Sequence, residues 1–131
     1  MSIKSSIAVV EDDESVREAT IGLLRSHGFI VKGFASADDF LKSNRIRITS
    51  CLIADVQMPN MSGLALYGHL VAVGMPIPTI LITAYPDESG RARALNAGVT
   101  GYLPKPFSEK DLLDCIAAAA KHGVTLAPTR R

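Results

Sequence analysis

The sequence predicts an α/β fold in which five parallel strands form one sheet and five helices cover its two faces. Three observations lead to this prediction. Short apolar runs rich in branched residues alternate with longer amphipathic stretches along the whole chain. Each strand-plus-helix unit has about 20–30 residues, enough for a crossover helix between parallel strands. The total of 131 residues is the size of a single domain.

The expected strands are apolar runs that end at polar residues. The first, 7–10, is continuously apolar and suits a strand buried on both faces. The second, 29–34, is interrupted by Lys32 and Gly33, which favours a place nearer an edge of the sheet. The remaining three strands are expected at 51–54, 78–83 and 99–103.

Helix start and stop signals separate these runs. Ser36 and Ser108 are typical N-caps, and Gly98 and Gly123 are typical of the residue just after a helix. A polar connection is expected at 42–49. A turn is expected at 58–63. The helices are expected from Ser15 to Ser26, from the cap Ser36 to Leu41, from the end of that turn to about Val73, from Pro86 to Asn96, and from the cap Ser108 to Gly123.

Composition and charge exclude several classes of protein. A hydrophobic fraction of 47% with 21% charged residues is that of a globular domain with a core of its own. The net charge of +1 argues against direct nucleic-acid binding by bulk electrostatics. No apolar run approaches the ~20 residues that span a membrane, and the first run is too short for a secretory signal. Cys51 and Cys115 are too far apart in the sequence for a metal-binding motif. We therefore expect a soluble, cytoplasmic protein with no membrane partner.

Chemically active side chains follow four of the five expected strands. In open parallel sheets, ligands bind beyond the carboxyl ends of the strands. The side chains that would meet there are Glu11, Asp12, Asp13, Asp55, Thr83 and Lys105. Two carboxylates ~4 Å apart repel by about 1–4 kcal/mol, and a single lysine cannot balance three of them. Oxygen ligands select Mg²⁺ or Mn²⁺, and a carboxylate beside such an ion can attack phosphorus. An aspartyl phosphate is the resulting hypothesis.

Four motifs in this order resemble the receiver domain of two-component response regulators, of the chemotaxis-regulator and FixJ-like kind. The motifs are residues 9–14, 55–63, 81–84 and 101–107. The resemblance extends from Ile7 to about Lys121 and implies a flavodoxin-like sheet with strand order 2-1-3-4-5. It also implies a receiver domain over residues 1–123, followed by a C-terminal tail at 124–131.

The resemblance assigns the acidic residues to phosphotransfer. It implies that Asp55 accepts a phosphoryl group from a phosphohistidine of a sensor histidine kinase or a phosphotransfer protein. Asp12 and Asp55 would ligate Mg²⁺ directly, together with the backbone carbonyl of Gln57, and Glu11 would act through a bound water. Asp13 belongs instead to the turn that caps the following helix.

The resemblance also assigns phosphoryl binding and a switch. The Thr83 hydroxyl, the backbone N–H of Ala84 and the Lys105 ammonium would hold the phosphoryl group. Thr83 and Tyr102 would then move together and change the surface of the fourth helix, fifth strand and fifth helix. A downstream protein or a second copy of the chain would bind that surface. The resemblance further suggests a cis peptide bond between Lys105 and Pro106.

Three other functions fit the sequence less well. A haloacid-dehalogenase-type phosphatase expects a second aspartate two positions after the nucleophile, where this chain has Gln57, and it needs a cap domain. A flavin binder of the flavodoxin type expects a phosphate loop after the first strand, where the acids of this chain would repel phosphate. A receiver that only docks partners is disfavoured because Asp12, Asp55, Thr83 and Lys105 are all present.

Overall fold

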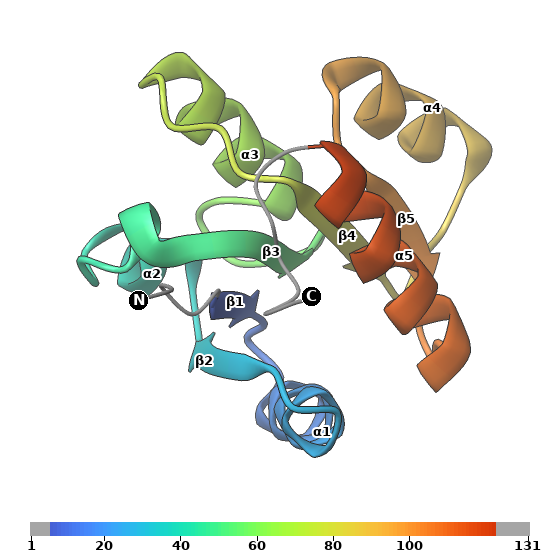
Figure 1. The fold of residues 1–131 in the computed structure, drawn as a ribbon. Helices are drawn as coiled ribbons and strands as arrows, with labels where there is room; N and C mark the ends of the chain where they lie inside the picture. Colours follow the sequence, from blue (N-terminus) through green and yellow to red (C-terminus); the bar gives the residue numbers. More distant parts are fainter. Residues whose placement is uncertain (1–5, 123–131) are drawn as a thin grey trace.

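A computed structural model describes residues 6–122 of the chain, with side chains described for 6–120. Its five strands form one parallel sheet in the order β2-β1-β3-β4-β5, which confirms the predicted flavodoxin-like topology (Figure 1). The strands are β1 (Ser6–Val10), β2 (Ile30–Phe34), β3 (Thr49–Asp55), β4 (Thr79–Thr83) and β5 (Gly101–Pro104). As predicted, β2 lies at an edge of the sheet.

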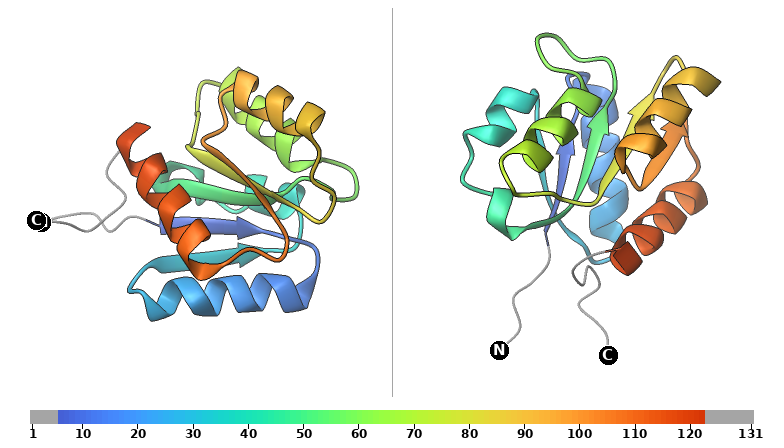
Figure 2. Two further views of the ribbon diagram at one scale, coloured as in Figure 1. Left: turned by 90° about the vertical axis from the view of Figure 1, so that its right-hand side faces the viewer. Right: turned by 90° about the horizontal axis from the view of Figure 1, so that it is seen from above.

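Helices connect the strands and cover the sheet on both faces (Figure 2). They are α1 (Glu14–Ser26), α2 (Ala37–Leu41), α3 (Gly63–Ala72), α4 (Glu88–Ala97) and α5 (Glu109–His122), with a short 3₁₀ helix η1 (Ile46–Ile48) before β3. The predicted end of the last helix at Gly123 and the predicted tail at 124–131 lie outside the described residues.

The core has two layers because alternate residues of each buried strand face opposite sides of the sheet. Ile7 and Val9 of β1 pack with Leu24 of α1 and with Leu112 and Ile116 of α5. The intervening strand positions pack against the other three helices, through Phe40 of α2, Leu66 and Leu70 of α3, and Ala94 of α4. All residues of β1, β3 and β4 are buried, which fixes the positions of the loops that follow these strands.

Most helix starts agree with the sequence because capping depends on local residues. The side chains of Asp13, Ser36 and Ser62 each accept a hydrogen bond from the backbone N–H three residues later. Ser108 does the same for α5, accepting from the N–H of Asp111 at 3.0 Å. The assignment of Asp13 to the capping turn is therefore confirmed.

Several predicted boundaries were wrong. Asp87 is the N-cap of α4, so Pro86 precedes this helix and does not lie in its first turn. The predicted polar connection at 42–49 contains η1, and β3 already begins at Thr49 because its backbone pairs with β1. The last strand starts two residues later than predicted, at Gly101.

Candidate functional site

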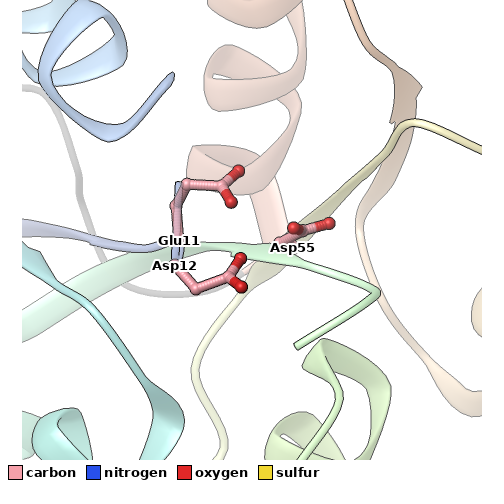
Figure 3. Close-up of side chains that lie close together, drawn as sticks. All are labelled: Glu11, Asp12 and Asp55. Atoms are coloured by element: carbon pink, nitrogen blue, oxygen red, sulfur yellow. The ribbon is translucent and has the colours of Figure 1, made fainter. Parts of the chain in front are cut away.

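The strand register brings the predicted acidic residues to one edge of the sheet. Val10, the last residue of β1, pairs with Ala54 of β3, and Asp55 pairs with Ile82 of β4. The residues after β1 therefore lie beside the end of β3. Carboxylate oxygens of Glu11, Asp12 and Asp55 all lie within 4.8 Å of one another (Figure 3).

The three carboxylates differ in their exposure to solvent. Glu11 is fully buried and Asp55 is 4% exposed, whereas Asp12 is exposed. The Glu11 backbone is fixed by a hydrogen bond from its N–H to the carbonyl of Phe34 in β2, at 3.0 Å. Its side chain accepts a second bond, from the N–H of Asp13 at 3.1 Å. Two acidic side chains are thus held at depth while a third borders the solvent.

Lys105 supplies the positive charge of this cluster. Its ammonium lies 2.8 Å from Oε1 of Glu11 and 3.2 Å from Oδ2 of Asp55. Burial lowers the pKa of Lys105, but the hydrogen bonds and charges of Glu11 and Asp55 outweigh burial and raise that pKa overall. The Lys105 backbone is anchored by its N–H, which donates to the carbonyl of Thr83 at 2.7 Å. The Lys105–Pro106 peptide bond is cis, as predicted.

Thr83 lies at the end of β4 with its hydroxyl fully engaged. The hydroxyl donates to Oε1 of Gln57 at 2.9 Å and accepts from the backbone N–H of Tyr85 at 3.0 Å. Thr83 is completely buried, whereas Gln57 and the adjacent Ala84 are exposed. The N–H of Gln57 also donates to Oδ1 of Asp55, at 3.3 Å.

Tyr102 lies on the strand next to Thr83 and packs toward α4. It is half-buried and contacts the core layer that α2, α3 and α4 share. Its hydroxyl lies close to Gly90 of α4, where an added Cβ would come within 3.1 Å of it. The absence of a side chain at Gly90 therefore gives the tyrosine room against this helix.

The donor set of the cluster fits a hard divalent cation. Among the side chains that the structure describes, three carboxylates gather at one point and one ammonium pairs with them, which leaves an excess of negative charge. Carboxylate oxygens are the ligands that Mg²⁺ and Mn²⁺ take in proteins. Glu11, Asp12 and Asp55 together are therefore the candidate ligands for such an ion.

Sequence reasoning placed every acidic residue of the cluster but missed the bond between Gln57 and Thr83. The two residues follow neighbouring strands, so their proximity could have been predicted from the strand order. That the amide oxygen of Gln57 accepts the hydroxyl proton depends on two side-chain conformations, and no sequence pattern carries that information.

Comparison with known proteins agrees with this geometry. Residues 7–117 match the family described as the response regulator receiver domain. The chain belongs to this family. As a receiver domain it is a signalling module and not an enzyme that turns over an external substrate, and receiver domains partner with histidine kinases. Within residues 6–122, no helix of the receiver is long and apolar enough to cross a membrane.

Individual relatives and solved structures support the assignment. The receiver is 40% identical over 120 residues to nodulation protein W of Bradyrhizobium diazoefficiens, a match covering 92% of this chain and 53% of the relative. It superimposes on the response regulator StyR with a TM-score of 0.83 and 44% identity, over 91% of this chain and 60% of StyR. The BeF3-activated DrrB receiver domain matches with a TM-score of 0.79 and 25% identity, over 90% of this chain and 98% of that one. The chain spans about half the length of the curated relatives it matches.

Proposed function

We propose that this receiver domain accepts a phosphoryl group on Asp55 from a histidine kinase or a phosphotransfer protein. The observation that carries this proposal is the environment of Asp55. Its carboxylate is nearly buried at the end of β3, faces the Lys105 ammonium at 3.2 Å, and lies within 4.8 Å of two other acids. A carboxylate placed in this way is an oxygen nucleophile beside a fixed positive charge.

The reaction balances as a transfer between two protein side chains. An Oδ atom of Asp55 forms a new bond to phosphorus, and the bond from phosphorus to the imidazole nitrogen of the phosphohistidine breaks. The bonding electron pair leaves with that nitrogen. The product is an acyl phosphate on Asp55, and hydrolysis by water later restores the carboxylate.

The acidic residues would hold a divalent cation during this transfer. Asp12 and Asp55 would ligate Mg²⁺, or Mn²⁺ in its place, together with the backbone carbonyl of Gln57, and Glu11 would act through a water. When bound, the ion supplies positive charge to the phosphoryl oxygens and offsets repulsion among the carboxylates. Glu11 also positions Lys105, whose ammonium lies 2.8 Å from Oε1.

The phosphorylated aspartate would be recognised by residues at the ends of β4 and β5. The Lys105 ammonium already contacts Asp55 and can pair with the new oxyanions. The Thr83 hydroxyl and the N–H of Ala84 would donate to the remaining phosphoryl oxygens. Tyr102 would follow the movement of Thr83 and change the surface formed by α4, β5 and α5.

The changed surface would bind a downstream protein or a second copy of the chain.

We place the domain boundary at residue 123, with 124–131 as a tail, and the phosphotransfer in the cytoplasm. The match to the family over 7–117 supports a domain of about this extent.

The first test measures phosphorylation directly. The protein is incubated with Mg²⁺ and acetyl phosphate, and its intact mass is recorded. We expect the gain of one phosphoryl group, with acetate as the leaving group. Alkali should remove this group, because the product on Asp55 is an acyl phosphate that base hydrolyses. Asp55→Asn, which keeps the size of the side chain but removes the nucleophile, is expected to show no gain.

A chelator provides the second control, and it should abolish the gain in the wild-type protein. If acetyl phosphate and a phosphohistidine donor both leave the mass unchanged, the proposed phosphotransfer is wrong. The domain would then act by docking partners without phosphorylation. Equal labelling of Asp55→Asn would place the acceptor at another residue.

A further inference from the structure

The hydrogen bonds around Thr83 form a closed ring with Asp55. The N–H of Gln57 donates to Oδ1 of Asp55, and Oε1 of Gln57 accepts the proton of the Thr83 hydroxyl. The carbonyl of Thr83 accepts from the N–H of Lys105, whose ammonium returns to Oδ2 of Asp55. Gln57 is the one member of the ring with an exposed side chain, and Thr83 is the most deeply buried.

The Thr83 hydroxyl has a single proton to donate. Its oxygen already accepts a hydrogen bond from the N–H of Tyr85 at 3.0 Å, and its proton is directed to Gln57 at 2.9 Å. A phosphoryl group on Asp55 would need the same proton. Gln57 and the phosphoryl oxygen are therefore competing acceptors for one donor.

We propose that the Gln57 side chain is a latch that holds the Thr83 hydroxyl away from Asp55 in the unphosphorylated receiver. The inference rests on the proposed function and names Gln57 as a positioning residue that acts through Thr83. Because Thr83 is fully buried, its hydroxyl cannot turn to solvent and must exchange one acceptor for another. Because Gln57 is exposed, its amide is hydrated as soon as it leaves the hydroxyl. Opening the latch therefore costs only the net free energy of the hydrogen bond between Gln57 and Thr83, because water replaces the hydroxyl as the partner of the amide.

The latch lowers the affinity of the site for a phosphoryl group. The net contribution of one hydrogen bond, about 0.5–1.5 kcal/mol, changes an equilibrium constant by a factor of about two to ten. Removing the acceptor of Gln57 should therefore tighten binding of a phosphoryl mimic by that factor. Gln57→Met keeps the length of the side chain but removes the amide, and Gln57→Asn keeps the amide but shortens its reach. Both retain the backbone N–H and carbonyl at position 57.

The test titrates beryllofluoride, a mimic of the phosphoryl group, into the Mg²⁺-loaded receiver. Binding is followed by the NMR signals of the Thr83 and Tyr85 amides. We expect Gln57→Met and Gln57→Asn each to bind about two- to tenfold tighter than the wild-type protein. In a Thr83→Val background, which lacks the hydroxyl, the Gln57→Met change should leave the affinity unaltered. This double-mutant cycle separates the latch from any direct contact between Gln57 and the ligand.

A second measurement reports the latch without any ligand. Three-bond couplings from the Thr83 methyl group to the backbone give the populations of its side-chain rotamers. We expect one rotamer in the wild-type protein and a mixture in Gln57→Met. A mixture already present in the wild-type protein, or unchanged affinity in both Gln57 variants, would overturn the latch. If the Thr83 rotamers become mixed in Gln57→Met but neither protein binds beryllofluoride, the proposed function is overturned, whereas the hydrogen bond by which Gln57 holds the Thr83 hydroxyl is supported.

Discussion

The two thiols of the chain differ in how strongly the fold shields them. Cys51 lies within β3 and is completely buried, and burial raises the pKa of its thiol to about 12. Cys115 in α5 is partly exposed, and its pKa is raised by burial and by the neighbouring charges of Asp111 and Asp114. Only the thiolate reacts with alkylating reagents, so both cysteines should be alkylated slowly, and Cys51 much more slowly than Cys115.

Alkylation of the folded protein should therefore modify Cys115 before Cys51. Below pH 9.0, the ordinary pKa of a thiol, Cys51 holds roughly a thousandfold less thiolate than an exposed cysteine, and its burial blocks access as well. Digestion and mass spectrometry after timed iodoacetamide treatment identify the modified residue. In denaturant the two should react alike. Early modification of Cys51 in the native protein would show that β3 opens readily.

Cys51 also links stability to pH in a definite direction. The folded thiol keeps its proton up to a pH of about 12, whereas the unfolded thiol loses it near 9.0. Between these values the unfolded state binds fewer protons, so the free energy of unfolding falls as pH rises. Below pH 9.0 both states are protonated and this contribution is constant.

At the scale of elements, the start of α3 shows how closely a helix approaches the site. A Cβ on Gly63 would lie 2.5 Å from the carbonyl oxygen of Asp55 and 2.9 Å from Cδ2 of Leu81. The N–H of Gly63 also donates to the carbonyl of Val56 at 3.3 Å. Only a residue without a side chain lets α3 begin directly against the backbone of the proposed phosphoacceptor.

Two glycines of the same helix should therefore respond in opposite directions to alanine. Gly63→Ala should lower the free energy of unfolding by about 1–3 kcal/mol, because backbone atoms of β3 would have to move. Gly68→Ala meets nothing within 4 Å and should raise stability by about 0.5–1 kcal/mol through helix propensity. Urea denaturation followed by circular dichroism gives both values. A Gly63→Ala protein as stable as the wild type would mean that α3 does not contact β3 as closely as described.

Elements whose limits are set locally were the ones the sequence predicted best. Asp13 and Ser36 were predicted at the helix starts they cap, because a cap satisfies N–H groups within a few residues. Strand ends were predicted less well, because pairing with a neighbouring strand decides them. Thr49, for example, joins β3 by pairing with Ser6 of β1, although Thr49 and the next residue, Ser50, are polar and precede the apolar run.

At the scale of the whole molecule, the site draws on four strands that are far apart in the sequence. Its acids, Thr83 and Lys105 could be listed in advance because each follows an apolar run, and parallel strands bring such positions to one edge. Periodicity alone did not give the strand order, which came from the resemblance. The ion pair of Lys105 with Glu11 and the bond between Gln57 and Thr83 were not predicted, because side-chain conformations inside the folded cluster determine them.

The charge of the cluster contrasts with that of the chain as a whole. The net charge of the chain is +1, yet within the described part of the chain three carboxylates meet one ammonium at the site. Folding therefore works against local repulsion, which a divalent cation would relieve. We expect Mg²⁺ to raise the thermal unfolding midpoint by a few degrees. At ten times its dissociation constant, a ligand adds about 1.4 kcal/mol to the free energy of unfolding.

Substitution of Asp12 tests how Mg²⁺ stabilises the protein, because Asp12 both contributes to the repulsion and is a proposed ligand of the ion. Asp12→Asn should be more stable than the wild-type protein without Mg²⁺, by at most about 1 kcal/mol since the residue is exposed. Added Mg²⁺ should raise the unfolding midpoint of Asp12→Asn only slightly. Plots of the midpoint against Mg²⁺ concentration for this variant and the wild-type protein should therefore cross. Asp13→Asn, which keeps a capping side chain outside the cluster, should retain the wild-type response. Differential scanning calorimetry at constant ionic strength measures all three proteins. If the unfolding midpoints of Asp12→Asn and the wild-type protein rise in parallel with Mg²⁺ concentration, Asp12 does not hold the ion. Relief of carboxylate repulsion would then not be the reason that Mg²⁺ stabilises the protein.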